Sequence, residues 1–88
     1  MKMKYEFAAR EIVGEYILIP EGEAALAVSG MGSTNAVGAF ICEQLKENRS
    51  YDELYTNLLN EFDVDAEVAK ADLDEFLDKL TRLGLLER

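Results

Sequence analysis

The first half of the chain carries short apolar runs of the length and composition typical of β-strands. Aromatic and β-branched residues gather in residues 5–13, and residues 16–19 are apolar on both faces, which predicts a strand at the buried centre of a sheet. Residues 14–15, between the two runs, predict a two-residue hairpin turn with glycine at its first central position. Residues 1–4 are expected to form a frayed end.

An uncharged stretch at residues 24–34 follows a turn predicted at residues 20–22. Its first part, residues 24–29, is predicted to be a third strand, which successive hairpins would place at an edge of the sheet. Edge strands are normally protected by Lys, Pro or an inward-pointing charge. This segment has no such protection, so it is either the middle strand of its sheet or an open edge to which a peptide can add a strand.

The second half of the chain shows helical periodicity in three segments. Residues 30–32 end the strand, and the first helix is predicted to be capped by Ser33, Thr34 or Asn35. Gly38 within this helix lowers its propensity by about 1 kcal/mol, which indicates that another element approaches the backbone there. The apolar stripe of this helix consists of Val37, Phe40, Ile41 and Leu45.

Two further helices have clear start and stop signals. The second begins with a capping box, in which Ser50 and Glu53 satisfy each other's backbone N–H groups, and Asp65 is expected to cap the third. Gly84 is expected to end the third helix in a Schellman turn, followed by a turn or short extended piece at residues 85–86. The apolar positions are Tyr51, Leu54, Tyr55, Leu58, Leu59 and Phe62 in the second helix and Ala69, Leu73, Phe76, Leu77, Leu80 and Leu83 in the third.

Length and charge restrict the class of partner. The 88 residues, 49% of them hydrophobic, predict one folded domain that spans residues 1–88. Eighteen acidic and nine basic residues give a net charge of −9, whereas nucleic acids and anionic membranes bind basic surfaces, so a basic or neutral peptide or protein is the expected partner. The lone Cys42 excludes an internal disulfide, and no signal peptide or membrane-spanning run is present, so the expected location is the cytoplasm.

The sequence offers little catalytic chemistry. It contains no histidine, the usual general base and metal ligand. The glycines at positions 30 and 32 lack the Lys and Ser or Thr of a phosphate-binding loop. The alternating carboxylates Asp63, Asp65 and Glu67 lack the Gly and distal Glu of a calcium-binding EF-hand. We therefore expect neither enzymatic activity nor a cofactor or metal site.

Strands followed by three helices resemble a winged helix-turn-helix, an α+β fold that suggests DNA binding through the third helix. Residues 61–78, however, carry eight acidic residues and one Lys, and this charge would repel phosphate. A regulator that binds DNA or a transcription partner is therefore the alternative and not the leading hypothesis. An acyl carrier would need a modifiable Ser in an Asp-Ser-Leu context, which the sequence lacks.

Four segments carry a resemblance to a known family. They are Phe7-x-x-Arg10-Glu11-Ile12-x-Gly14-Glu15-Tyr16-Ile17-Leu18-Ile19-Pro20, Thr34-Asn35-x-x-Gly38-Ala39-Phe40-Ile41, Ser50-Tyr51-Asp52-Glu53-Leu54, and Asp72-Leu73-x-x-Phe76-Leu77-x-x-Leu80-x-x-x-Gly84-Leu85-Leu86. In this order they resemble the PqqD-like family, which includes coenzyme pyrroloquinoline quinone (PQQ) synthesis protein D. The resemblance covers residues 7–86. The family commonly has Trp where this chain has Cys42, a departure expected to alter packing and not binding.

The resemblance implies a winged-helix-like fold, with an N-terminal three-stranded antiparallel sheet followed by three helices, and a role in recognising ribosomally made, post-translationally modified peptides. Such modules hold the leader segment of a precursor peptide as an added strand between the third strand and the third helix. Either Lys70 or Lys79 is expected to pair with leader carboxylates. The implied peptide-binding residues are Ala25, Leu26, Ala27, Val28 and Ser29 of the strand and Ala69, Lys70, Leu73, Phe76, Leu77 and Leu80 of the helix.

The expected partners are therefore a precursor peptide and a maturation enzyme, often a radical S-adenosylmethionine (SAM) enzyme in this family. The resemblance does not imply PQQ synthesis itself, because relatives serve many pathways. An exposed sheet edge can pair with its own copy, so the expected state is a monomer or a weak homodimer. A third hypothesis is an accessory subunit that docks on an enzyme without contacting peptide.

Overall fold

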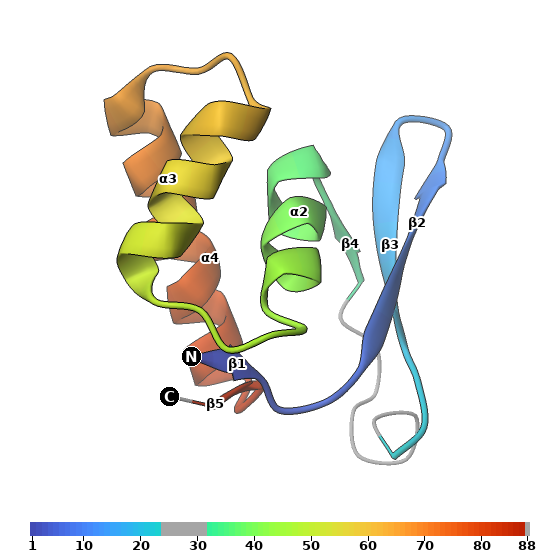
Figure 1. Cartoon of the computed structure of the whole chain (residues 1–88). Coiled ribbons are helices and arrows are strands. Elements are labelled where there is room, and N and C mark those ends of the chain that lie inside the picture. Colours follow the sequence, from blue (N-terminus) through green and yellow to red (C-terminus); the bar gives the residue numbers. More distant parts are fainter. Residues whose placement is uncertain (24–31, 88) are drawn as a thin grey trace.

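A β-hairpin leads into a group of helices in the computed structural model, which describes residues 1–23 and 32–87 (Figure 1). Within these residues a three-stranded antiparallel sheet in the order β2-β3-β4 is followed by three helices, so the predicted α+β, winged-helix-like fold is confirmed. The elements are β1 (Lys2–Met3), β2 (Phe7–Ile12), β3 (Glu15–Pro20), β4 (Ser33–Thr34), α2 (Ala36–Gln44), α3 (Tyr51–Glu61), α4 (Ala66–Arg82) and β5 (Leu86–Glu87).

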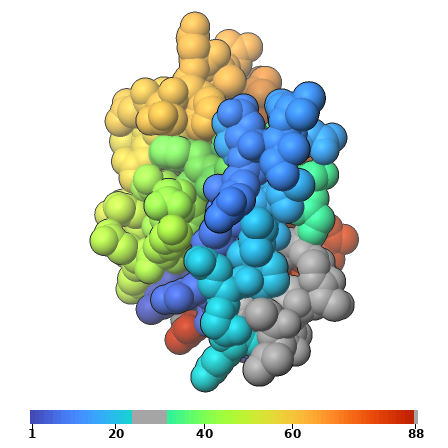
Figure 2. Space-filling view, turned by 90° about the vertical axis from the view of Figure 1, so that its right-hand side faces the viewer, coloured from blue at the N-terminus to red at the C-terminus, as the bar shows by residue number. Residues whose placement is uncertain are grey.

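Strand β3 is central in the sheet but is not buried on both faces. Leu18 is 3% exposed and packs in the core, whereas Ile19 on the opposite face is 39% exposed. The helices all lie on one side of the hairpin (Figure 1), and Figure 2 looks onto its outer side, where β2 and β3 cross the surface. The sequence prediction of a strand buried on both faces was therefore wrong, because the helices cover one face only.

The hairpin turn lies one residue earlier than the sequence pattern predicts. Ile12 pairs with Glu15, which makes Val13 and Gly14 the two central residues. Their φ angles are 48° and 80°, so both adopt the left-handed conformation of a type I′ turn. This turn follows the right-handed twist of the flanking strands, but it places a β-branched residue where L-residues other than Asn, Asp and Gly are disfavoured.

Replacing Val13 with asparagine is therefore expected to stabilise the protein by about 1 kcal/mol, because Asn tolerates a positive φ and Asn-Gly favours this turn. Val13 is 97% exposed, so no packing is lost. Urea-induced unfolding measures the change. The matched control Val13→Thr keeps the β-branch and should give no gain; an equal gain from both variants would show that hydrophobic exposure, and not backbone strain, is the cause.

Strand β4 forms the edge of the described sheet. Thr34 pairs with Tyr16 and Ser33 with Ile17, and the Leu18 N–H donates to the Gly32 carbonyl at 3.4 Å. The third strand predicted at residues 24–29 lies outside the described residues. The sequence pattern does not predict β4, because the glycines at 30 and 32 indicate the end of a strand.

The first residues are not frayed, contrary to the prediction. Strand β1 pairs with β5, and the backbone N–H of Met3 donates to the Leu45 carbonyl at 2.9 Å. The Lys4 N–H donates to the Leu85 carbonyl at 2.8 Å, and the Met3 side chain is only 6% exposed. An isolated apolar residue between two lysines shows no periodicity, so its burial could not be predicted from the sequence pattern.

Helix α2 lies between the hairpin and the other two helices (Figure 1), and its residues Ile41 and Cys42 belong to the core. The predicted apolar stripes are confirmed, except that Leu83 is 52% exposed. Cys42 lies in this core, where burial raises the pKa of its thiol to about 12. The largest side chains below 2% exposure in the core are Ile41, Leu45, Leu54, Leu58, Leu73, Leu80 and Leu85.

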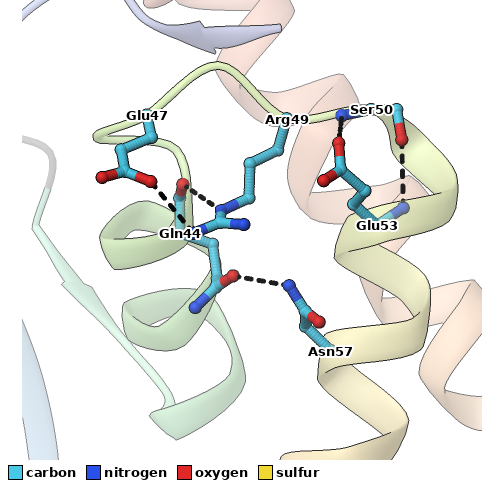
Figure 3. A network of polar contacts seen from close by, with 6 residues as sticks. All are labelled: Gln44, Glu47, Arg49, Ser50, Glu53 and Asn57. Carbon is cyan, nitrogen blue, oxygen red and sulfur yellow. Dashed lines mark hydrogen bonds and ion pairs between the residues drawn. The ribbon is translucent and has the colours of Figure 1, made fainter.

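The connection between α2 and α3 is held by the polar network of Figure 3. The Ser50 N–H donates to Glu53 Oε1 at 2.9 Å and the Glu53 N–H donates to Ser50 Oγ at 3.1 Å, which confirms the capping box. The Arg49 Nε donates to the Gln44 carbonyl at 3.1 Å, and Asn57 Nδ2 donates to Gln44 Oε1 at 2.8 Å. Gln44 at the end of α2 is thus connected both to Arg49 in the loop and to Asn57 of α3.

The ends of α4 were predicted with mixed success. Asp65 holds the N-cap position, but its side chain makes no capping hydrogen bond. At the other end Gly84 has φ 72°, the Leu85 N–H donates to the Leu80 carbonyl at 2.9 Å and the Gly84 N–H donates to the Thr81 carbonyl at 3.1 Å, which confirms the Schellman turn. None of the helices in the described part of the chain is long and apolar enough to span a membrane.

Candidate functional site

An open pocket of about 240 Å³ lies between the edge of the sheet and helix α4. Strand β4 and the first turn of α2 form one side, and α4 forms the other. We call this pocket the β4–α4 groove. It is lined by Thr34, Asn35, Val37, Gly38, Asp72, Glu75, Phe76 and Lys79.

The side formed by α2 is fixed by a helix cap and a glycine. Asn35 Oδ1 accepts a hydrogen bond from the Gly38 N–H at 2.9 Å, so the predicted cap is Asn35 and not its two predecessors. A Cβ atom added to Gly38 would overlap Thr34 Oγ1 and lie 2.9 Å from Phe76 Cε1. The predicted close approach at Gly38 is therefore confirmed, and it brings β4, α2 and α4 together at the base of the groove.

The α4 side of the groove has an apolar centre between charged positions. Phe76 is 9% exposed, and its ring is the part of α4 that packs against Gly38. Asp72 and Lys79 are half-buried on either side of it along the helix, and Glu75 is exposed. The groove can therefore accept an apolar side chain at its centre and polar groups at its two ends.

The structure separates the helix residues that the resemblance implies for binding. Ala69, Leu73 and Leu80 are at most 1% exposed and Leu77 is 4% exposed, so these four belong to the core. Of the apolar helix residues implied for binding, Phe76 is the one that lines the groove. The implied strand residues Ala25, Leu26, Ala27, Val28 and Ser29 lie outside the described residues.

Lys70 is exposed and lies away from the groove. Its Nζ is 3.3 Å from Asp74 Oδ2, and the Tyr51 hydroxyl donates to the other oxygen of the same carboxylate. The hydrogen bond from Tyr51, reinforced by Lys70, lowers the pKa of Asp74, and it raises the pKa of Tyr51 to about 12. Lys70 thus belongs to a link between α3 and α4, whereas Lys79, the other lysine predicted to meet leader carboxylates, lines the groove.

Sequence reasoning did not assign most of the groove lining to binding. It took Asn35 for a cap, Val37 for a core residue and Gly38 for a packing point. It placed Asp72 only within a family segment and gave Glu75 no role. The segment Thr34-Asn35-x-x-Gly38 could have indicated this part of the groove. Asn35 is a typical helix cap, and Gly38 three positions later leaves space for another element at the start of the helix.

Elsewhere the described residues form a second pocket but no group of side chains that could bind a metal ion. A second hollow, of about 440 Å³, lies away from β4 and α4 and is lined by Lys2, Met3, Lys4, Tyr5, Glu6, Glu21 and Lys46. Within residues 1–23 and 32–87, no three His, Cys, Asp or Glu side chains converge where they could hold a metal ion.

Comparisons with known proteins relate the fold to a family. The model of the family described as coenzyme PQQ synthesis protein D (PqqD) matches residues 15–86. Among solved structures, the chain is similar to one titled "TbiB1 in Complex with the TbiA(beta) Leader Peptide", with a TM-score of 0.70 and 26% sequence identity. That match covers 99% of this chain and 95% of the other. The comparison with curated proteins gives no match.

Proposed function

The chain belongs to the PqqD family, and from this premise we propose that it binds the leader segment of a ribosomally synthesised precursor peptide and presents it to a maturation enzyme. The observation that carries the proposal is the β4–α4 groove, in which the edge of a sheet faces a helix across an open pocket. The similar structure of TbiB1 is described as a complex with a leader peptide, which supports the same function for this chain.

The mechanism we propose is strand addition. A leader in extended conformation hydrogen-bonds the main chain at the sheet edge, which provides affinity with little demand on sequence. Phe76 then accepts an apolar side chain from the same leader face, at the base of the groove beside Gly38. We also propose, on the sequence grounds given above, that the main chain of residues 25–29 contributes to this edge.

For the enzyme partner we propose a radical SAM enzyme, as in many members of the family. The proposed role of the chain is to raise the local concentration of the core peptide at the enzyme. With a purified enzyme of this class, adding the chain should increase the modification rate of a full precursor and leave that of a leaderless core peptide unchanged. Equal acceleration of both substrates would contradict peptide presentation.

The charge of α4 argues against the DNA-binding alternative. The acidic residues Asp74, Glu75 and Asp78 are all exposed on this helix, which a winged-helix protein would place in the major groove. Two cations of the same helix are already engaged with Asp74 and Asp78. A surface of this composition repels a phosphate backbone.

Amide chemical shifts test the site directly. Isotope-labelled chain titrated with short peptides encoded beside its gene should show changes concentrated at Thr34, Gly38 and Phe76 and their neighbours. Such changes are expected because these residues form the base of the groove. Changes confined to the second hollow, which residues 2–6, Glu21 and Lys46 line, or no change with any such peptide, would contradict leader binding in the groove.

A bulky cation in the groove should weaken this binding. Val37 lines the groove, and Val37→Arg is expected to weaken leader binding at least about tenfold, because its long side chain occupies the space of the leader. The matched control is Val68→Arg on the 50% exposed position of α4 outside the groove lining, which should leave affinity within about twofold. Fluorescence anisotropy with a labelled leader measures both variants; equal losses would show that added charge, and not the groove, is responsible.

A further inference from the structure

Two half-buried charges in the β4–α4 groove have no ionic partner within the part of the chain that the structure describes. Asp72 and Lys79 line the groove on α4, and neither forms an ion pair or hydrogen bond with a residue of the ranges 1–23 and 32–87. Charged side chains that lose part of their hydration are usually paired, because the loss costs free energy. Within these two ranges neither charge is neutralised, so each can pair with a ligand of opposite charge.

The other cations of α4 show that ion pairing is possible along this helix. Lys70 Nζ lies 3.3 Å from Asp74 Oδ2, and Arg82 Nε lies 3.1 Å from Asp78 Oδ2, each across one helical turn. Glu75 precedes Lys79 by the same four residues, yet within the described residues these two form no ion pair.

Lys79 instead lies on the groove side of its helix. Burial raises the pKa of Cys42 to about 12, and the nearby positive charge of Lys79 partly offsets that rise. Lys79 also lines the groove together with Val37 and Gly38 of α2, so its side chain lies on the groove side of α4.

Resting on the proposed function, we infer that the groove selects leaders in which an acidic and a basic side chain flank an apolar one at alternate positions of the added strand. The acidic side chain faces Lys79, the apolar one contacts Phe76, and the basic one faces Asp72 and Glu75. Lys79 and Asp72 are thus specificity-determining residues for the leader, and they read the order of charge along it.

The spacing follows from the two backbone geometries. Asp72 and Lys79 are seven residues apart on α4, which is about 10 Å along the helix axis. Side chains on one face of a strand repeat about every 7 Å, so the outer two of three such side chains are roughly 13 Å apart, and the long Lys side chain covers the difference. Phe76 lies between the two charges, which sets the apolar position in the middle.

Charge order supplies selectivity that backbone pairing lacks. Strand addition alone accepts many sequences, and the net charge of −9 attracts basic peptides without discrimination. An acidic leader side chain is admitted only where it meets a cation, because a like charge in a partly desolvated groove is repelled. Lys79 is the groove residue that provides that cation.

A display library of random short peptides tests the inference without a known precursor. Selection on the wild-type chain should enrich peptides with the acidic–apolar–basic pattern at alternate positions. Selection on Lys79→Gln should lose the acidic preference, and selection on Lys79→Glu should replace it with Lys or Arg. The matched control Lys70→Glu changes the same charge outside the groove and should leave the wild-type pattern intact.

A peptide synthesised from the wild-type pattern then provides a charge-swap measurement. It should bind Lys79→Glu roughly tenfold more weakly than wild type, and a peptide in which lysine replaces its acidic residue should recover that loss. If the wild-type chain enriches no peptide, the proposed function fails. If the wild-type chain enriches peptides without an acidic preference, or Lys79→Glu keeps that preference, only the inference about charge order is overturned.

Discussion

Replacing Leu73 with alanine is expected to lower the free energy of unfolding by about 3 kcal/mol, because the leucine side chain is 0% exposed and its removal leaves a cavity between tightly packed helices. Small domains are stable by only about 5–15 kcal/mol, so this loss is a large share of the total. The corresponding fall in melting temperature is roughly 10–20 °C for a chain of this size. Thermal and urea-induced unfolding measure it.

Leader affinity separates the structural role of Leu73 from the binding role that the family resemblance implies. Below its melting temperature, Leu73→Ala should bind a leader peptide within about twofold of wild type, because Leu73 does not line the β4–α4 groove. The control Leu73→Met keeps most of the volume and should cost less than about 1.5 kcal/mol. Unchanged stability together with lost binding would identify Leu73 as a contact residue and contradict the assignment to the core.

Local signals in the sequence were sufficient to predict the helices. The reciprocal bonds of Ser50 and Glu53 and the glycine turn after α4 depend on residues a few positions apart, and both are present in the structure. The strand segments depend on more distant partners. Met3 is buried because it meets β5 and the end of α2, some 40 or more residues away in the chain, and no local pattern reports such a contact.

The difference between local and long-range contacts also explains which residues of the β4–α4 groove could be predicted. An apolar stripe on α4 was evident, but a stripe does not show which of its residues face a neighbouring helix and which face an open groove. Phe76 and Leu73 are three residues apart and equally apolar in the pattern; the structure places the first at the groove and the second wholly in the core. Gly38 predicted the position of the groove better than the apolar stripe, because a glycine inside a helix indicates that another element packs closely there. The structure identifies the neighbours as Thr34 and Phe76.

Replacing Gly38 with alanine is expected to lower both the stability of the protein and its affinity for the leader. In an isolated helix Gly38→Ala would stabilise by about 1 kcal/mol. Here the new Cβ would overlap Thr34 Oγ1 and lie 2.9 Å from Phe76 Cε1, so the side chains of Thr34 and Phe76 must both move. Overpacking of this kind costs about 1–3 kcal/mol, so after the gain in helix propensity we expect a net loss of about 1 kcal/mol in urea-induced unfolding.

A double-mutant cycle with Thr34→Ala tests this cause. Removing the Thr34 hydroxyl and methyl groups opens space on the β4 side of Gly38, so Thr34→Ala with Gly38→Ala should be about 1 kcal/mol more stable than the sum of the single effects predicts. Leader affinity should fall in Gly38→Ala, because the displaced Thr34 and Phe76 side chains both line the groove, and it should partly return in the double variant. Additive effects, or a Gly38→Ala variant more stable than wild type, would show that β4 and α4 do not meet at this glycine, and the groove between them would lose its base.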